Sequence, residues 1–227
     1  MIVGERKEVD EIRDMLPEDI EELLIVGCGT CVTVSLAGGE REAKSLRDLL
    51  ELYFSQNGES LDIAADAIKR QCDDEFIDEI EEQIEKSDAV LSLACGIGVQ
   101  HLAIRFPEKL ILPGLNTTFY GRTSATGEWE EMCHGCGECV LDRFAGICPI
   151  ARCSKSLLNG PCGGSEDGNC EVDDEIDCGW ELIYERAKEL EVFDRLLEHE
   201  EPKDWTTYRD GGVRSHKNPE FFRSGGE

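Results

Sequence analysis

The sequence has few basic residues and no long apolar run, and each shortage excludes a class of protein. Only 23 basic side chains stand against 50 acidic ones, which gives a formal charge of −27 over 227 residues. A surface this acidic repels phosphate backbones, so nucleic acid is excluded as a partner on electrostatic grounds. No apolar run approaches the roughly 18 residues that a membrane helix needs. Residues 1–15 also lack the apolar core of a secretory signal, so we expect a cytoplasmic protein without membrane insertion.

Cysteine, by contrast, is abundant. The chain contains 12 cysteines, more than a reduced protein needs for packing. A reducing cytoplasm disfavours disulfides, so metal ligation explains this number better. The apolar fraction of 40% is close to that of ordinary globular domains. We therefore expect one or two folded domains that bind metal.

Short apolar runs alternate with amphipathic stretches over the first 125 residues. The apolar runs, which read as strands, cover residues 23–26, 61–65, 89–94 and 110–112. The amphipathic stretches, which read as helices, cover residues 5–16, 41–54, 74–86 and 99–105. Apolar strands that alternate with helices are typical of a sheet covered on both faces. The sequence therefore predicts an α/β domain over residues 1–125, built on an open, mainly parallel sheet.

A glycine-containing turn follows the first apolar run, where a dinucleotide-binding loop would stand. It reads Gly-Cys-Gly-Thr-Cys over residues 27–31, and Val32 occupies the position of the third glycine. No acidic residue follows a second clear strand at the usual distance. The turn therefore does not predict a nicotinamide or flavin site in this chain.

Four cysteines fall in the turns that follow three of the predicted strands. These turns lie along one edge of a parallel sheet, so their thiolates can converge. Helices that begin there point backbone N–H groups at the site, which offsets the negative charge of the thiolates. We predict one metal site with the ligands Cys28, Cys31, Cys72 and Cys95. The alternative is that Cys72 and Cys95 are buried as small apolar side chains, while the other two form a redox pair.

Residues 126–200 have a different character, with eight cysteines, many glycines and little periodicity before a final helix. Metal ligation has to supply much of the folding free energy of such a segment. Three cysteines at intervals of three suit three corners of a cubane cluster, and a cysteine before a proline commonly ligates a neighbouring cluster in ferredoxins. The set is sufficient for two [4Fe-4S] clusters. Its members are Cys133, Cys136, Cys139, Cys148, Cys153, Cys162, Cys170 and Cys178.

The division of these eight ligands between two clusters is open, because the spacings after residue 148 match no ferredoxin pattern. The arrangement we expect joins the run at residues 133–139 to Cys178, and Cys148, Cys153 and Cys162 to Cys170. Structural zinc is the rival, since two four-cysteine zinc sites also use eight thiolates. Zinc usually takes separated pairs of cysteines, however, and a run of three leaves one over.

The C-terminal part is expected to contain a helix with an apolar stripe between residues 180 and 197, and then an extended tail over residues 201–227. The aromatic residues of the tail suit an arm that lies across a partner, although a frayed terminus is an equal alternative. These residues are Trp205, Tyr208, Phe221 and Phe222. The polar stretch 116–122 reads as a loop that connects elements or contacts a partner, and less readily as the border of a substrate pocket.

Several short motifs resemble the MetV family, the zinc-type or iron–sulfur-type accessory subunit, or C-terminal domain, of methylenetetrahydrofolate reductase. They are residues 28–32 (Cys-Gly-Thr-Cys-Val), 37–40 (Ala-Gly-Gly-Glu), 70–72 (Arg-Gln-Cys), 93–96 (Leu-Ala-Cys-Gly), 147–149 (Ile-Cys-Pro), 152–153 (Arg-Cys) and 157–164 (Leu-Leu-Asn-Gly-Pro-Cys-Gly-Gly). The closing segments 178–184 and 202–205 are similar too. One departure is Ser35, where many members of the family carry a further cysteine.

The resemblance implies a partner, the MetF-type catalytic subunit, a flavin-binding TIM barrel that reduces methylenetetrahydrofolate in one-carbon pathways such as acetyl-CoA synthesis. The FMN or FAD is expected in that partner and not in this chain. Because a flavin accepts electrons singly and delivers a hydride, we predict a non-catalytic iron–sulfur subunit that relays electrons through three [4Fe-4S] clusters. Ferredoxin or further electron-transfer subunits are the other candidate partners. The alternatives are a zinc-stabilised docking subunit of the same reductase and, more weakly, an independent enzyme.

Overall fold

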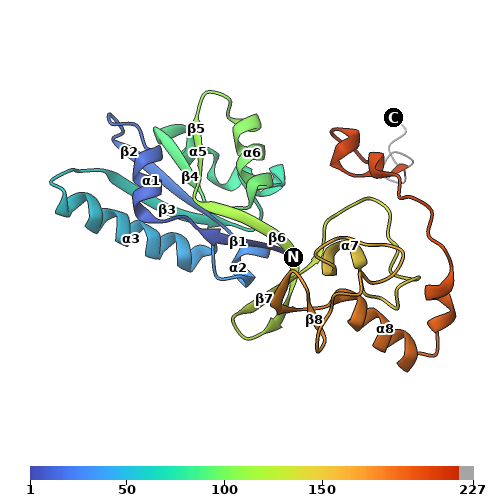
Figure 1. The fold of residues 1–227 in the computed structure, drawn as a ribbon. Coiled ribbons are helices and arrows are strands. Elements are labelled where there is room, and N and C mark those ends of the chain that lie inside the picture. Colours follow the sequence, from blue (N-terminus) through green and yellow to red (C-terminus); the bar gives the residue numbers. More distant parts are fainter. Residues whose placement is uncertain (220–227) are drawn as a thin grey trace. The chain divides into compact units, whose positions relative to one another are not determined.

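The structure is a computed structural model that describes residues 1–219. The chain divides into two compact units, Met1–Glu130 and a second unit that begins at Glu131, and each is described by itself. Figure 1 shows the strands of the first unit in blue to green and the short elements of the second in yellow to red. Among residues 1–219, none of the helices combines the length and the apolar composition of a membrane span.

A four-stranded parallel sheet forms the centre of the first unit. Its strands stand in the order β3 (Asp62–Ile68), β2 (Glu22–Cys28), β4 (Ala89–Ser92) and β5 (Leu110–Pro113). Every neighbouring pair in it is parallel. Strand β2 lies inside the sheet and is buried from its second residue to its last, which explains its nearly continuous apolar sequence. The prediction of a mixed α/β fold with a mainly parallel sheet is confirmed.

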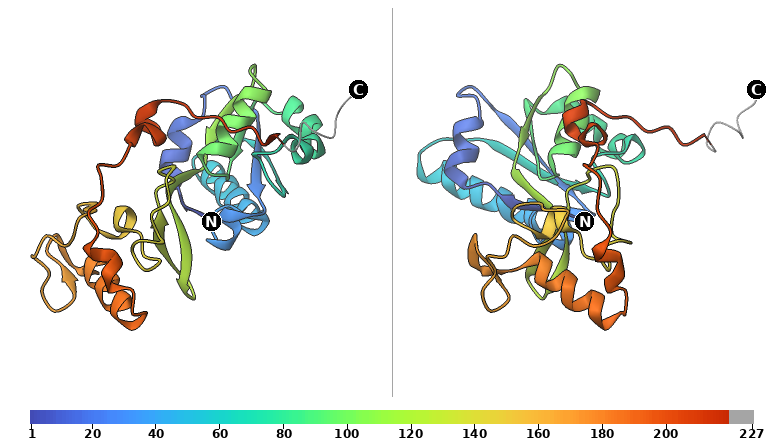
Figure 2. Two further views of the ribbon diagram at one scale, coloured as in Figure 1. Left: turned by 90° about the vertical axis from the view of Figure 1, so that its right-hand side faces the viewer. Right: turned by 45° about the vertical axis from the view of Figure 1, so that its right-hand side comes forward.

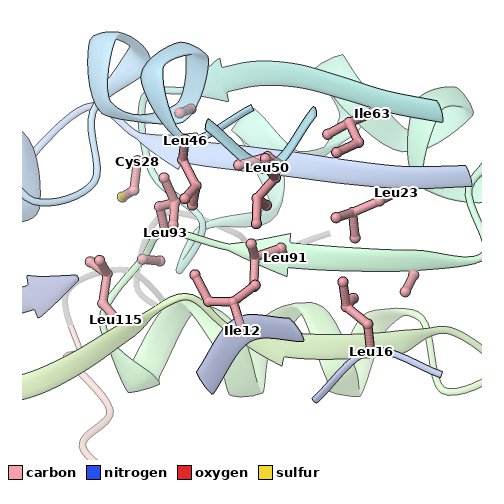
Figure 3. Packing of buried hydrophobic residues seen from close by; sticks show 14 of the residues in the cluster. Ile12, Leu16, Leu23, Cys28, Leu46, Leu50, Ile63, Leu91, Leu93 and Leu115 are labelled. Atoms are coloured by element: carbon pink, nitrogen blue, oxygen red, sulfur yellow. The ribbon is translucent and has the colours of Figure 1, made fainter. Parts of the chain in front are cut away.

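Helices cover both faces of this sheet, as the views in Figure 2 show. These helices are α1 (Val9–Met15), α2 (Cys31–Val34), α3 (Glu40–Gln56), α4 (Asp74–Ile77), α5 (Glu81–Lys86) and α6 (Gly96–Arg105). On one face, Leu46 and Leu50 of α3 and Ile12 of α1 pack with Leu91 of β4 (Figure 3). On the other face, residues from α4, α5 and α6 pack against Leu24, Val26 and Val90. Alternate residues of each strand thus enter opposite cores.

The helix expected over residues 74–86 is interrupted. A 3₁₀ turn, η1 (Asp78–Ile80), separates α4 from α5. The break falls at Ile80, whose φ of −123° and ψ of 8° lie outside the helical range. Ile77, Ile80 and Ile84 are nevertheless buried together in the same core. The apolar spacing therefore predicted the buried face correctly, although the backbone is not one continuous helix.

A second sheet, which is antiparallel, was not expected. Its strands are β1 (Ile2–Arg6), β6 (Leu115–Ala125) and β7 (Glu128–Cys133), in that order. The start of the helix predicted from residue 5 belongs to β1, and the polar loop predicted at residues 116–122 is a strand that pairs with it. Most side chains of β6 are exposed, so no apolar alternation marked it as a strand in the sequence.

The second unit contains short elements around a small core. They are α7 (Pro149–Arg152), β8 (Asn169–Cys170), β9 (Asp173–Asp177), α8 (Gly179–Glu189) and the 3₁₀ turns η2 (Phe193–Leu197), η3 (Trp205–Thr207) and η4 (Arg209–Gly211). The rings of Phe144 and Trp180 meet edge to face in the core, with centroids 5.6 Å apart. The predicted helix ends before Glu191, which has a φ of 56°. The tail was expected to be extended, but part of it forms η3 and η4. Phe221 and Phe222 lie outside the described residues.

Candidate metal centres

Four cysteines lie at one edge of the parallel sheet, and we call them the sheet-edge cysteines. Cys28 is the last residue of β2 and Cys31 is the first of α2. Cys72 follows β3, and Cys95 immediately precedes α6. Since β3, β2 and β4 are parallel neighbours, their carboxyl ends meet at the same edge. The topology therefore gives these cysteines the common location that the sequence predicted.

Three of the four sheet-edge thiols lie close enough to interact electrostatically. Partial desolvation raises the pKa of the Cys72 thiol, and the neighbouring Cys28 and Cys95 thiols raise it further. The turns that carry them are in contact, since the amide of Gly29 donates to the carbonyl of Ile68 at 2.9 Å. Cys28 reaches this edge from the buried core and is only 7% exposed (Figure 3). Cys31 is assigned to this edge only because it lies three residues after Cys28, at the start of α2.

A buried polar pair, which the sequence did not reveal, fixes the turn that carries Cys72. The Gln71 side chain is fully buried, and its Nε2 donates to the carbonyl of Val26 on β2 at 2.8 Å. Its Oε1 accepts a hydrogen bond from the Ser92 hydroxyl on β4 at 2.6 Å. Ser92 is also fully buried, and its oxygen accepts the amide of Ala94 at 3.2 Å. This pair, the Gln71–Ser92 clamp, ties the ends of β2, β3 and β4 together beside three of the thiols.

Backbone N–H groups also face this edge. Cys95 stands at the N-cap position of α6, whose first N–H groups have no partner inside the helix and favour negative charge nearby. Gly96 donates its amide to the hydroxyl of Thr117 at 2.8 Å, so the unpredicted strand β6 contributes to the same edge. The Thr33 hydroxyl donates to the carbonyl of Cys28 at 2.7 Å. These contacts hold the thiol-bearing turns in one conformation.

The run Cys133–Cys139 forms the first cysteine loop of the second unit. Gly135 and Gly137 adopt φ angles of 61° and 89°, which let the backbone fold back toward the sulfurs. The amide of Gly135 donates to Cys133 Sγ at 3.3 Å, and Cys136 Sγ donates to the carbonyl of Glu138 at 3.3 Å. His134 pairs with Glu131 at 3.2 Å, so its imidazole already has a carboxylate partner.

Cys148 lies near this loop, which differs from the arrangement expected from the sequence. Desolvation raises the pKa of the Cys148 thiol, and the charges of Cys136 and Cys133 raise it further. Cys148 directly precedes α7, which starts at Pro149. Spacing along the chain does not reveal the path of a loop, which is why the expected assignment separated Cys148 from the run. We call this set the first loop group, and its members are Cys133, Cys136, Cys139 and Cys148.

The four remaining cysteines lie on neighbouring segments of the second unit. Cys153 and Cys178 both border the small core. A Cβ placed on Gly179 would lie only 3.0 Å from the backbone nitrogen of Cys153, so the two segments touch. The Ser154 hydroxyl lies 3.4 Å from Cys170 Sγ and lowers the pKa of that thiol. Glu171 approaches Gly164, two residues beyond Cys162. We call these four cysteines, Cys153, Cys162, Cys170 and Cys178, the second loop group.

The chemistry of these donors fits iron–sulfur clusters or zinc. All twelve cysteines are within the described residues, and all are free thiols. Thiolate is the ligand that both kinds of centre prefer, at four per cluster or per zinc ion. No group of three or more His, Cys, Asp or Glu among residues 1–219 has the compact geometry that a single metal ion needs.

One comparison with known proteins gave a match. Residues 112–206 are similar to a protein family described as methylene-tetrahydrofolate reductase C terminal. The matched segment covers the eight cysteines of both loop groups but none of the sheet-edge cysteines. No curated protein and no solved structure matched the chain significantly.

Proposed function

We propose that this chain is the iron–sulfur electron-transfer subunit of a methylenetetrahydrofolate reductase complex, of the MetV type. The proposal is supported by the presence of twelve free thiols and by two places where three of them lie near one another, Cys28, Cys72 and Cys95 in the first unit and Cys133, Cys136 and Cys148 in the second. The similarity of residues 112–206 to a reductase C-terminal family supports an association with that enzyme. The relay role itself rests on the number and chemistry of the thiols.

In this proposal each set of four cysteines holds one [4Fe-4S] cluster, giving three clusters in all. A bound four-iron cluster supplies one-electron transfer, with one thiolate on each iron. The chain provides the ligands and the hydrogen bonds that orient them. In the first loop group, the amide of Gly135 already reaches Cys133 Sγ. Hydrogen bonds of this kind to ligand sulfurs raise the reduction potential of a cluster.

The proposed partner is a MetF-type subunit that contains FMN or FAD. Exposed apolar side chains near the sheet-edge cysteines support a docking surface there. Ile97, two residues beyond Cys95, is 51% exposed, and Leu36, five residues beyond Cys31, is 63% exposed. Large apolar side chains at such positions stabilise a complex when a partner covers them. A flavin that meets this surface accepts electrons singly and passes them on in pairs as a hydride.

Anaerobic electron transfer to the partner tests this function. The chain is reduced with dithionite, freed of excess reductant and mixed with the oxidised flavin subunit in a stopped-flow instrument. We expect loss of the flavin's visible absorbance in step with reoxidation of the iron–sulfur centres. A variant with Cys72→Ser and Cys95→Ser, which removes two sheet-edge ligands, should slow or abolish the transfer.

The matched control is Ser87→Ala, which changes a buried hydroxyl outside the cysteine turns. If the chain binds the flavin subunit but never reduces it, the protein is a docking subunit and the relay is refuted. A zinc-loaded, colourless protein that still binds the reductase would give that result.

A further inference from the structure

The C-terminal segment Lys203–Arg214 packs on the first cysteine loop, and we call it the C-terminal strap. The Thr207 hydroxyl donates to the carbonyl of Cys136 at 3.0 Å. Arg214 Nη2 donates to the carbonyl of Gly135 at 3.2 Å. The sequence suggested an arm for a partner, but this part of the tail contacts the chain's own cysteines.

Gly137 shows how close the contact is. A Cβ placed on this glycine would lie 2.3 Å from the carbonyl oxygen of Thr207, well inside the contact distance of the two atoms. The residue also has a φ of 89°, which disfavours any other amino acid. The strap and the loop therefore fit together only with glycine between Cys136 and Glu138.

Lys203 brings a buried positive charge to this contact. Its side chain is only 2% exposed, and its Nζ lies 3.0 Å from Glu138 Oε2. The same ammonium lies 3.5 Å from the Glu138 carbonyl, which also accepts the hydrogen bond from Cys136 Sγ. The Trp205 ring, 5.8 Å from Nζ, covers it on another side. The carbonyl oxygen of Glu138 thus lies within 3.5 Å of both the ammonium of Lys203 and the sulfur of Cys136, which places the positive charge close to this ligand.

We propose that Lys203 raises the reduction potential of the centre held by the first loop group. This inference rests on the proposed iron–sulfur function. A cluster gains one negative charge on reduction, and a nearby cation shielded from water stabilises that form. Without Lys203, the carboxylate of Glu138 would lie beside the loop uncompensated, and reduction would become less favourable.

A redox titration of the intact chain, followed by electron paramagnetic resonance, tests the proposal. In Lys203→Met we expect the reduction potential of one of the three centres to fall. The fall should be at least about 59 mV, which corresponds to a tenfold change in the ratio of reduced to oxidised centre for one electron. Lys203→Arg should restore the potential, because it keeps the charge. Lys86→Met, which removes a lysine that is 75% exposed on α5, is the matched control and should change nothing.

Glu138→Gln separates an electrostatic role from a structural one. It leaves the charge of Lys203 without a partner, so the same couple should shift in the opposite direction, toward higher potential. Equal potentials in all variants, at full iron content, would overturn the role of Lys203 and leave the relay intact. A shift of the same sign in Lys203→Met and Glu138→Gln, or loss of the centre in both, would reduce Lys203 to a packing residue. Absence of iron from the wild-type chain would instead refute the proposed function.

Discussion

The two units place cysteines in opposite ways. In the first unit, the sheet-edge cysteines stand on turns between strands and helices that enclose two apolar cores. The second unit has eight cysteines, and the core cluster described in it contains only five buried residues, one of which is Cys178. We therefore expect the first unit to keep its fold without metal, and the second to depend on ligation to fold.

Metal removal should produce the largest difference between the two units. After anaerobic treatment with a chelator, we expect the backbone amides of residues 133–178 to lose protection against hydrogen exchange, while β2, β4 and α3 keep theirs. Structural metals contribute on the order of 10 kcal/mol to the folding of small zinc modules, more than a core of this size provides. Hydrogen exchange measured by mass spectrometry locates the change. Equal loss of protection in both units would show that the sheet also needs metal.

A cavity in the core of the first unit should have the next largest effect, and it should destabilise the first unit and leave the second unchanged. Leu46→Ala removes a fully buried side chain of α3 and should lower the free energy of unfolding of the first unit by about 2–5 kcal/mol. Leu52→Ala, at a 55% exposed position of the same helix, is the matched control and should have little effect. Urea unfolding followed by circular dichroism measures both. The centres of the second unit should remain intact in Leu46→Ala, because its own ligands hold that unit.

Loss of the Gln71–Ser92 clamp should show whether the clamp positions the thiol of Cys72 or only stabilises the fold. Gln71→Leu removes the acceptor of the buried Ser92 hydroxyl and one of two donors to the Val26 carbonyl, which keeps the amide of Leu93, at a cost of about 1–3 kcal/mol. We expect the sheet-edge centre to be lost from an otherwise folded protein, so that iron per chain falls by about one cluster, or four atoms. Gln71→Glu keeps the acceptor oxygen for Ser92 and should lose less iron. Full iron content in Gln71→Leu would show that the clamp does not position Cys72.

The smallest effect should come from Asp88, at the opposite end of β4. Its carboxylate accepts the amides of Glu22 and Glu21 at 2.9 and 3.0 Å, and these hydrogen bonds, that from Glu22 first, hold the pKa of the carboxyl below its usual value. A lowered pKa gives stability that is present above the ordinary value, about 4, and is lost as the pH falls through the folded-state value. The difference in Tm between wild type and Asp88→Asn should therefore be constant above about pH 5 and shrink below about pH 4. A constant difference down to pH 2 would contradict this role.

The sequence predicted the parts of the molecule that depend on continuous apolar patterns. The buried run at residues 23–26 identified β2, and the parallel arrangement then placed Cys28, Cys72 and Cys95 at one edge by topology alone. Strand β6 was missed because its side chains are mostly polar and its partner, β1, lies more than a hundred residues earlier. Gln71 was missed because its two hydrogen bonds reach β2 and β4, and no local pattern encodes such contacts. The nearness of Cys148 to Cys133 and Cys136 could not be predicted for the same reason, because spacing along the chain does not reveal the path of a loop.

The central claim, that three sets of four thiolates hold iron–sulfur clusters, is tested most directly by metal analysis. Iron, zinc and acid-labile sulfide are measured per chain on protein purified without oxygen, together with an electron paramagnetic resonance spectrum after reduction with dithionite. The account predicts about twelve irons and as many sulfides per chain, with the signal of reduced [4Fe-4S] clusters. Two or three zinc ions per chain, without sulfide or signal, would contradict it.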